Sequence, residues 1–201
     1  HAIRWMHSKH RPVIGWGLGA GQSSGLEAAL RRRFLLSLDA VIAYSQTGAE
    51  QYRMLGIPAE RVFVAANAVA LKPSQPPLQR PPTFKDGKPV LLYVGRLQVR
   101  KRLDVLIRAC ALMPETQRPR LVLVGDGPAR EELEALAAAV YPDTEFQGAH
   151  HGAELDPFYA AADLFVLPGT GGLAIQQAMA QSLPVLVGEA DGTQAELVRP
   201  E

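Results

Sequence analysis

One pattern recurs along the chain: a short apolar run, then a glycine or polar turn, then a longer stretch with helical periodicity. In the second half it predicts strands at 90–94, 121–124, 144–147, 164–167 and 185–187. Helices are expected between them, at about 103–112, 128–140, with Pro128 at its first position, 155–162 and 173–181. Such alternation is typical of βαβ units, so we expect an α/β fold with parallel sheets flanked by helices.

The first part of the chain carries fewer repeats of this pattern. Strands are expected at 12–16, 40–44 and 61–66, with one helix at about 26–38 and another from an N-cap at Ser45 or Thr47 to Met54. Four apolar residues at four-residue spacing are expected to form the apolar face of the first helix: Leu26, Leu30, Phe34 and Leu38. Because a doubly wound domain needs five or six strands, we expect the second half of a domain that begins earlier.

A proline-rich segment separates the two parts. Residues 72–88 contain five prolines and few apolar side chains, a composition typical of an extended connector. We therefore predict three regions: residues 1–71, the end of a first domain; residues 72–88, a linker; and residues 89–201, a second domain that is also truncated.

Charge and cysteine content exclude several classes of protein. The formal net charge is +1, so no overall positive field indicates a nucleic-acid partner. The single cysteine, Cys110, cannot form a disulfide framework or a Cys-based zinc site, and it fits a reducing, cytoplasmic setting. No apolar run is long enough for a membrane span.

Two cations follow the strand predicted at 90–94. Arg96 and Lys101 come after Gly95, and ligands of open parallel sheets bind at the carboxyl ends of the strands. Each cation about 4 Å from a phosphate oxygen would contribute roughly 4 kcal/mol at an effective dielectric constant of 20, before desolvation. The alternative is a solvated basic loop, because Arg100 and Arg102 are neighbours.

A glycine-rich loop precedes the helix predicted at 173–181. Gly169, Gly171 and Gly172 would let a phosphate or sugar approach the backbone at a helix N-terminus, where N–H groups are free. Gln177 in the helix could bond a sugar hydroxyl. The alternative is a simple turn followed by a solvent-facing glutamine.

Together these segments resemble a known family. The relevant motifs are Gly95-Arg96-Leu97-x3-Lys101, Val124-Gly125-Asp126-Gly127-Pro128, Phe146-x-Gly148 and Leu167-Pro168-Gly169 leading to Gly172-Leu173-Ala174-Ile175-x-Gln177-Ala178-Met179-Ala180. In order and spacing they resemble retaining glycosyltransferases of the family-four group (glycosyl transferases group 1). Residues 41–69 resemble the end of that group's first domain. The resemblance implies the GT-B fold, two Rossmann-like domains with parallel sheets, the first only partly present here.

The resemblance also implies roles for particular residues. Gly95 and the two cations that follow it, Arg96 and Lys101, would bind the donor diphosphate. Arg96 and Lys101 would act in catalysis by stabilising its charge. Gly172 and Leu173 would add backbone N–H groups, and Gln177 would contact the ribose. The base would be bordered by Gly125, Gly127, Gln147 and Gly148.

The reaction implied is transfer of a hexose from a nucleoside diphosphate sugar to a hydroxyl acceptor with retention of configuration, in polysaccharide or glycolipid biosynthesis. The acceptor would be a saccharide or a lipid-linked molecule. No cofactor is expected, and no metal, since Asp-x-Asp is absent and the adjacent His150 and His151 are better explained as surface residues. The helix with Arg31, Arg32 and Arg33 could touch anionic lipid peripherally, or present a solvated basic face.

Some positions depart from the family's pattern. Many members have Glu at the positions of Gly169 and Gln177, and a His near Leu18, so a catalytically degenerate nucleotide-sugar-binding protein is the alternative. An NAD-dependent oxidoreductase is a weaker one: Gly15-x-Gly17-x-x-Ala20 is similar to a dinucleotide fingerprint, but the next strand ends in Tyr44-Ser45, without an acid. No Gly-Lys-Ser/Thr triplet indicates a P-loop.

Overall fold

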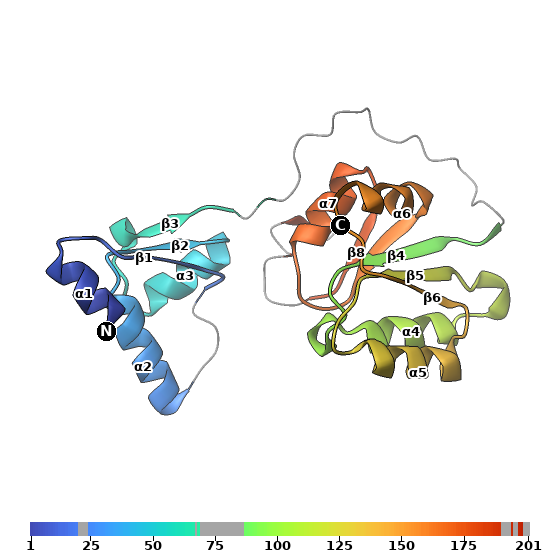
Figure 1. Ribbon diagram of the computed structural model, residues 1–201, viewed down its shortest axis with the longest axis horizontal. Helices are drawn as coiled ribbons and strands as arrows, with labels where there is room; N and C mark the ends of the chain where they lie inside the picture. Colours follow the sequence, from blue (N-terminus) through green and yellow to red (C-terminus); the bar gives the residue numbers. More distant parts are fainter. Residues whose placement is uncertain (20–23, 67, 69–86, 190–193, 195–196, 199–201) are drawn as a thin grey trace. The chain divides into compact units, whose positions relative to one another are not determined.

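The computed structural model describes residues 1–19, 24–66, 68, 87–189, 194 and 197–198. The chain divides into two compact units, His1–Asn67 and Ala68–Glu201, and each contains one parallel sheet (Figure 1). Residues 72–86 of the predicted linker lie outside the described residues. The predicted region boundaries therefore remain a prediction.

The first unit is built on a three-stranded sheet of order β1-β2-β3. All described pairings in it are parallel. Its strands are β1 (Ile14–Gly17), β2 (Ala40–Ala43) and β3 (Val62–Val64). Its helices are α1 (Ala2–Ser8), α2 (Gly25–Leu36), α3 (Gln46–Met54) and the 3-10 turn η1 (Ala59–Arg61). A small core joins them, formed by Leu38, Val41, Ala43, Ala49, Tyr52, Ile57 and Val62.

The start of α3 agrees with the sequence. Ser45 is its N-cap, and the side-chain oxygen accepts a hydrogen bond from the Gly48 N–H at 3.0 Å. The bond satisfies one of the N–H groups that a helix leaves without an internal partner. By contrast, α1 was not predicted, because none of its residues is buried and it shows no apolar periodicity.

The apolar face predicted for α2 is mostly exposed in the structure. Leu26, Leu30 and Phe34 are 76%, 59% and 55% exposed, and only Leu38, which follows the helix, is buried. The helix instead turns Leu35 and Leu36 toward the core. Four-residue spacing identifies a stripe on a helix, but it does not say which side of the helix meets the sheet.

The second unit is a five-stranded parallel sheet of order β6-β5-β4-β7-β8. Its strands are β4 (Val90–Val94), β5 (Arg120–Val124), β6 (Thr144–Gly148), β7 (Leu164–Leu167) and β8 (Val185–Val187). Its helices are α4 (Leu103–Leu112), α5 (Arg130–Val140), α6 (Asp156–Ala161) and α7 (Leu173–Ala180), with 3-10 turns η3 (Val99–Lys101), η4 (Glu115–Gln117) and η5 (Gly152–Leu155). From β4 the chain builds outward to β6 and then returns to build β7 and β8 on the other side, so the strand order reverses at β4.

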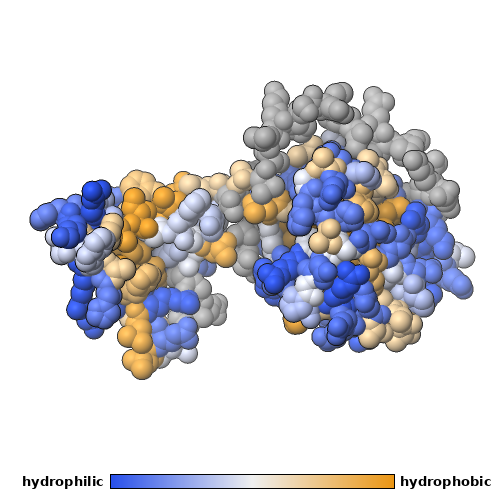
Figure 2. Space-filling view, in the orientation of Figure 1, coloured by the Kyte–Doolittle hydropathy of each residue, from blue (hydrophilic) through white to orange (hydrophobic). Residues whose placement is uncertain are grey.

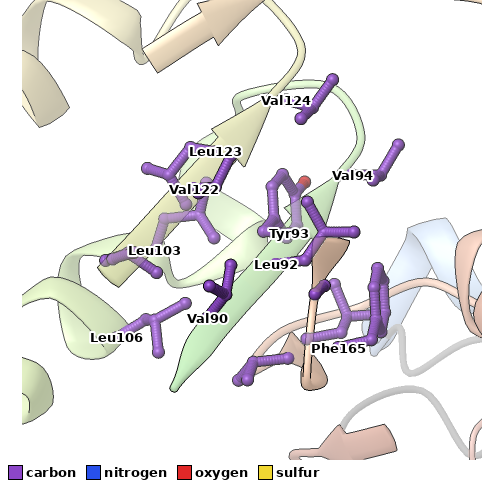
Figure 3. Packing of buried hydrophobic residues seen from close by; sticks show 14 of the residues in the cluster. Val90, Leu92, Tyr93, Val94, Leu103, Leu106, Val122, Leu123, Val124 and Phe165 are labelled. Atoms are coloured by element: carbon purple, nitrogen blue, oxygen red, sulfur yellow. The ribbon is translucent and has the colours of Figure 1, made fainter. Parts of the chain in front are cut away.

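The core of this unit lies on both faces of β4. Helices α4 and α5 cover one face of the sheet and α6 and α7 the other (Figure 1). Leu103 and Leu106 of α4 and Phe165 of β7 pack near the β4 side chains (Figure 3). A strand buried on both faces reads as a continuous apolar run, which explains why Val90–Val94 was recognisable in the sequence.

The prediction that Pro128 opens a helix is wrong by two residues. Helix α5 begins at Arg130, with Ala129 as its N-cap. The Ala129 N–H donates to the Leu97 carbonyl at 3.2 Å, so the residues after Gly127 contact the loop after β4 instead of starting the helix. Among the described residues, no helix combines the length and apolar character needed to cross a membrane.

Candidate functional site

The glycine loops at the carboxyl ends of β4, β5 and β6 interlock. The Gly95 N–H donates to the Val124 carbonyl at 2.9 Å, and the Gly125 N–H donates to the Gly148 carbonyl at 2.7 Å. A Cβ at Gly125 would overlap the Gly95 carbonyl. Similarly, a Cβ at Gly127 would overlap the carbonyl of Leu97. Four predicted site glycines, namely Gly95, Gly125, Gly127 and Gly148, therefore lie at one edge of the sheet.

Turn η3, which carries Lys101, is bound to the loop after β7. The Lys101 ammonium donates to the Thr170 carbonyl at 2.5 Å, and the Thr170 N–H donates to the Arg100 carbonyl at 3.1 Å. The Arg100 guanidinium also donates to Thr170 Oγ1 at 2.7 Å. A Cβ at Gly169 would overlap the Arg100 carbonyl oxygen, so only glycine allows these backbones to approach so closely.

This contact places a cation beside a helix N-terminus. Gly172 is the N-cap of α7 and Leu173 its first residue. The Lys101 Nζ lies 2.8 Å from the position that a Cβ on Gly171 would occupy. The first backbone N–H groups of a helix have no intrahelical acceptor and carry the positive end of its dipole. The predicted Lys101, Gly172 and Leu173 thus come together in an arrangement that suits a phosphate.

Arg96 is exposed and follows Gly95 in the loop after β4. Its carbonyl accepts a hydrogen bond from the buried Tyr93 hydroxyl at 3.1 Å, and burial raises the pKa of Tyr93 above its usual range, which keeps that hydroxyl a neutral donor. Within the described part of the chain, the Arg96 guanidinium has no hydrogen-bond or ion-pair partner. The loop fixes the backbone of Arg96, while its side chain is available to a ligand.

The other predicted residues lie on β6 and α7. Gln147 is exposed, and its amide nitrogen donates to the Glu145 carboxylate at 3.0 Å. Gly148 ends β6 with a left-handed φ of 78°. Gln177 lies half-buried in α7, and its carbonyl accepts a hydrogen bond from the Gln181 N–H at 3.1 Å.

Sequence reasoning missed two residues. Thr170 links both basic side chains of η3 to the glycine loop, although it was read only as part of that loop. Gln194 is 3% exposed, and its Nε2 donates to the Gly169 carbonyl at 2.7 Å. Its Oε1 is buried and receives no hydrogen bond from a described residue. A single glutamine in a polar stretch carries no periodic signal that could have identified it.

The residues considered for a metal site or an NAD site do not lie in the geometry that such a site needs. His150 contacts the Gln147 carbonyl at 3.2 Å and the Phe158 ring, with centroids 4.9 Å apart. Across the described ranges, no cluster of three or more His, Cys, Asp or Glu residues could hold a metal ion. Gly15 and Gly17 lie inside β1, whereas a dinucleotide fingerprint needs its glycines in the turn after a strand.

Known proteins share this architecture. The crystal structure of Anabaena HepE in complex with UDP and glucose superposes with a TM-score of 0.74 over 99% of this chain and 58% of that protein, at 21% sequence identity. With the parallel sheets of both units, this likeness identifies the GT-B fold that the sequence predicted.

The family follows from the sequence of the second unit. Residues 88–201 match the profile of the family Glycosyl transferases group 1, and the chain belongs to this family. The sulfoquinovosyl transferase SQD2 of Arabidopsis thaliana is 38% identical over 52% of this chain, and the GDP-mannose-dependent alpha-mannosyltransferase of Mycobacterium tuberculosis is 38% identical over 57% of it. The chain covers 20% and 29% of the length of these two relatives.

Proposed function

We propose that this chain forms the donor-binding part of a glycosyltransferase that moves a hexose from a nucleoside diphosphate sugar to a hydroxyl acceptor, with retention of configuration and without a metal ion. The observation that carries the proposal is the position of the Lys101 ammonium beside the N-terminus of α7. A fixed cation next to free backbone N–H groups matches the charge and the hydrogen-bonding needs of a diphosphate.

In this proposal the diphosphate is the leaving group. As the bond between the sugar and the phosphate oxygen breaks, negative charge grows on that phosphate, which can take the proton of the attacking hydroxyl on the same face of the sugar. The contribution of the protein is to stabilise that charge with donors already in position. Lys101 and the N–H groups of Gly172 and Leu173 supply the fixed part, and Arg96 supplies a second cation that moves to the ligand.

The neighbouring loops would receive the nucleoside. Gly125, Gly127, Gln147 and Gly148 border the proposed base site, and Gln177 would contact the ribose. A neutral amide bonds a hydroxyl more weakly than a carboxylate does, by about 1 kcal/mol. Gln177 would thus weaken donor binding relative to a Glu at this position without abolishing it.

The relatives support a sugar-nucleotide donor in general terms. One is named for its use of GDP-mannose, another for transfer of sulfoquinovose, and HepE was crystallised with UDP. We extend the proposal to a saccharide or lipid-linked acceptor, polysaccharide or glycolipid biosynthesis, and a cytoplasmic location. The identity of the base and of the sugar must be measured.

A second candidate is a nucleotide-sugar-binding protein without turnover. It is favoured by Gly169, where overlap with the Arg100 carbonyl leaves no room for the carboxylate side chain that many family members carry. Leu18, which is exposed after β1, likewise has no group that could bond a sugar. Sugar transfer by the intact polypeptide would exclude this candidate.

The test is a calorimetric titration of the chain with UDP, GDP, ADP and their common sugar conjugates in the presence of a chelator, with NAD as the comparison. Saturable binding of one nucleoside diphosphate would support the proposal and identify the base. Binding of NAD, or a requirement for a divalent metal, would contradict it. Retention is tested separately, from the anomeric configuration of the product of the intact polypeptide.

A further inference from the structure

The outer sides of α4 and α5, the two helices on one face of the second unit's sheet, carry an apolar patch. Val105 and Leu112 are 40% and 87% exposed, and because they are seven residues apart they lie on one side of α4. Figure 2 shows hydrophobic residues at the lower edge of the second unit, where these helices lie in Figure 1. Four exposed alanines continue this outer patch: Ala109 on α4, and Ala135, Ala138 and Ala139 on α5.

The inner sides of both helices are already used in packing. Leu106 and Ile107 of α4 are buried in the core, and so are Leu133 and Ala137 of α5. Rotating either helix would expose these residues, so the outer patch cannot be buried within its own unit. Single exposed apolar residues are ordinary, but a patch that continues across two neighbouring helices is typical of a surface that contacts another molecule.

Two charges of opposite sign lie in the groove beside the outer patch. Arg108 of α4 and Glu132 of α5 both line this groove, which lies between the two helices and has a volume of about 350 Å³. Among the described residues, neither side chain has an ion-pair or hydrogen-bond partner, and the two do not pair with each other. By contrast, the nearby Arg130 is neutralised by Glu134 at 2.7 Å. The groove therefore offers one unpaired charge of each sign to a binding partner.

We infer that the outer patch is a self-association surface, which binds the same patch on a second copy of the chain about a two-fold axis. In a two-fold contact every pairing occurs twice, so Arg108 of each copy faces Glu132 of the other. The apolar side chains of the two copies are then covered between these charge pairs. A surface that carries both signs beside an apolar patch is complementary to itself, and this is the observation that selects a second copy.

The total charge around the outer patch argues against other partners. The two helices, with Arg102 at the start of α4, have three arginines, Arg102, Arg108 and Arg130, against four carboxylates, Asp104, Glu131, Glu132 and Glu134. Such a nearly balanced surface does not attract anionic lipid or nucleic acid, which need a basic one. It also brings little like charge together when it meets a copy of itself.

The size of the outer patch determines how strong the pairing is. Helices of ten and eleven residues are about 15 Å long, and two of them side by side are about 20 Å wide. This is less than the roughly 800 Å² that each partner buries in a standard interface. We therefore expect a weak dimer whose population rises with protein concentration.

Sedimentation velocity of the intact polypeptide across the micromolar range tests the inference. The parent should shift from monomer to dimer as its concentration rises. Arg108→Glu and Glu132→Arg should each weaken the association about tenfold or more, because each variant places like charges opposite one another at two points. The matched control is Arg53→Glu on α3, which reverses an exposed charge outside the outer patch and should associate like the parent.

An equimolar mixture of the two charge variants gives the sharpest result. In a mixed dimer, the Arg108→Glu chain meets the Glu132→Arg chain with opposite charges facing at both points, so association should return to the parent level. The double variant Arg108→Glu/Glu132→Arg should recover it as well. Recovery also shows that the single variants are folded. A parent that stays monomeric, single variants that associate normally, or a mixture that does not recover would overturn the inference.

The apolar part of the outer patch has its own test. Val105→Ser/Leu112→Ser should weaken association about tenfold, because both exposed side chains are covered in the dimer. Leu26→Ser is the control, since it changes a leucine that is 76% exposed on α2, in the other unit, and should leave association unchanged. Equal association of the parent and the double serine variant would contradict the proposed surface.

A labelling experiment tests whether another part of the polypeptide covers the outer patch. Ala109→Cys, made in the intact polypeptide, should react quickly with a thiol reagent in dilute solution and more slowly as the concentration rises. Protection even in dilute solution would assign the patch to another segment of the same polypeptide and overturn the inference. The inference does not depend on the proposed donor site, and nucleotide affinity should be the same in every variant of the outer patch.

Discussion

The ammonium of Lys101 and the carbonyl oxygen of Thr170 are joined by a 2.5 Å hydrogen bond between residues 69 positions apart in the sequence. The bond connects the turn after β4 to the loop after β7, the two strands between which the order of the sheet reverses. A backbone carbonyl thus helps to hold the Lys101 ammonium in place.

Replacing Lys101 should weaken donor binding. We expect Lys101→Ala to lose roughly 2 to 3 kcal/mol of nucleoside diphosphate affinity, because the phosphate would lose a charged donor held in place. Calorimetry measures the loss. Arg108→Ala, which removes an exposed cation from α4, is the control and should bind normally. Equal affinities in the two variants would mean that the phosphate binds elsewhere.

Adding one methyl group at Gly169 should separate the two loops. A Cβ there would overlap the Arg100 carbonyl and lie 2.7 Å from Lys101 Cα, so we expect Gly169→Ala to destabilise the second unit by about 1 to 3 kcal/mol. Urea unfolding measures the change. Gly152→Ala is the comparison, since its Cβ would meet nothing within 4 Å and only its left-handed φ of 56° would cost energy. A Gly169→Ala chain as stable as the parent would show that the loops separate freely.

Gln194 offers a test of positioning. Gln194→Leu removes the donor to the Gly169 carbonyl, but it also removes a buried Oε1 that has no described partner. The two effects oppose each other, so we expect the stability of the second unit to change by less than about 1 kcal/mol. Donor affinity should fall about fivefold, because the glycine loop loses its anchor. Unchanged affinity would limit Gln194 to a packing role.

Asp39 should make the first unit sensitive to acid. The Val13 N–H donates to its carboxylate at 2.7 Å and His7 contacts it at 2.9 Å, and both hold the pKa of Asp39 below its usual value of 3.8. A lowered pKa in the folded state gives stability that is complete above about pH 3.8 and is lost as the pH falls through the folded-state pKa. Both tryptophans, Trp5 and Trp16, lie in this unit, so their fluorescence reports its unfolding.

The variant Asp39→Asn is the control for this titration. It should be less stable than the parent near neutral pH and lose less stability between neutral pH and pH 3. Parallel curves for the two chains would assign the acid sensitivity to other carboxylates.

Cys110 should report opening of the second unit. Burial raises the pKa of its thiol to about 11, and the side chain lies in the core on α4. Since the thiolate is the reactive form, labelling by a thiol reagent at neutral pH should be very slow and should accelerate when urea opens the unit. As the single cysteine of the chain, it gives one labelling signal. Rapid labelling without denaturant would reveal a local opening of α4.

The predictions of helices and strands were most accurate for the elements that are most buried. Val90–Val94 and Leu103–Leu112 were placed to the residue, because a strand buried on both faces and a helix with one buried stripe have clear patterns. In α2 the apolar face is mostly exposed, which the pattern alone does not reveal, since the orientation of a helix depends on its neighbours. The GT-B fold was recognised from motif order, which tolerates such errors.

The predicted site residues remain a prediction, and the structure shows why some of them are glycines. Gly95, Gly125 and Gly127 were identified from their resemblance to family motifs, and at Gly125 and Gly127 the structure supplies a reason, because a Cβ there would overlap a carbonyl of the loop after β4. The contact of Lys101 with Thr170 was not predictable, because it depends on a carbonyl, which every residue possesses. Gln194 was missed for a related reason: its importance comes from the tertiary position of one amide group.

The central place of β4 also governs how this unit is made during synthesis. Its partners are β5, which follows soon after, and β7, whose Leu164 pairs with Leu91 from 73 positions away. Until the ribosome has released β7, one edge of β4 stays open, with an apolar run and unpaired backbone groups. The nascent chain therefore passes through a period in which one edge of the apolar strand β4 is unpaired, and chaperones that cover such edges would act on it then.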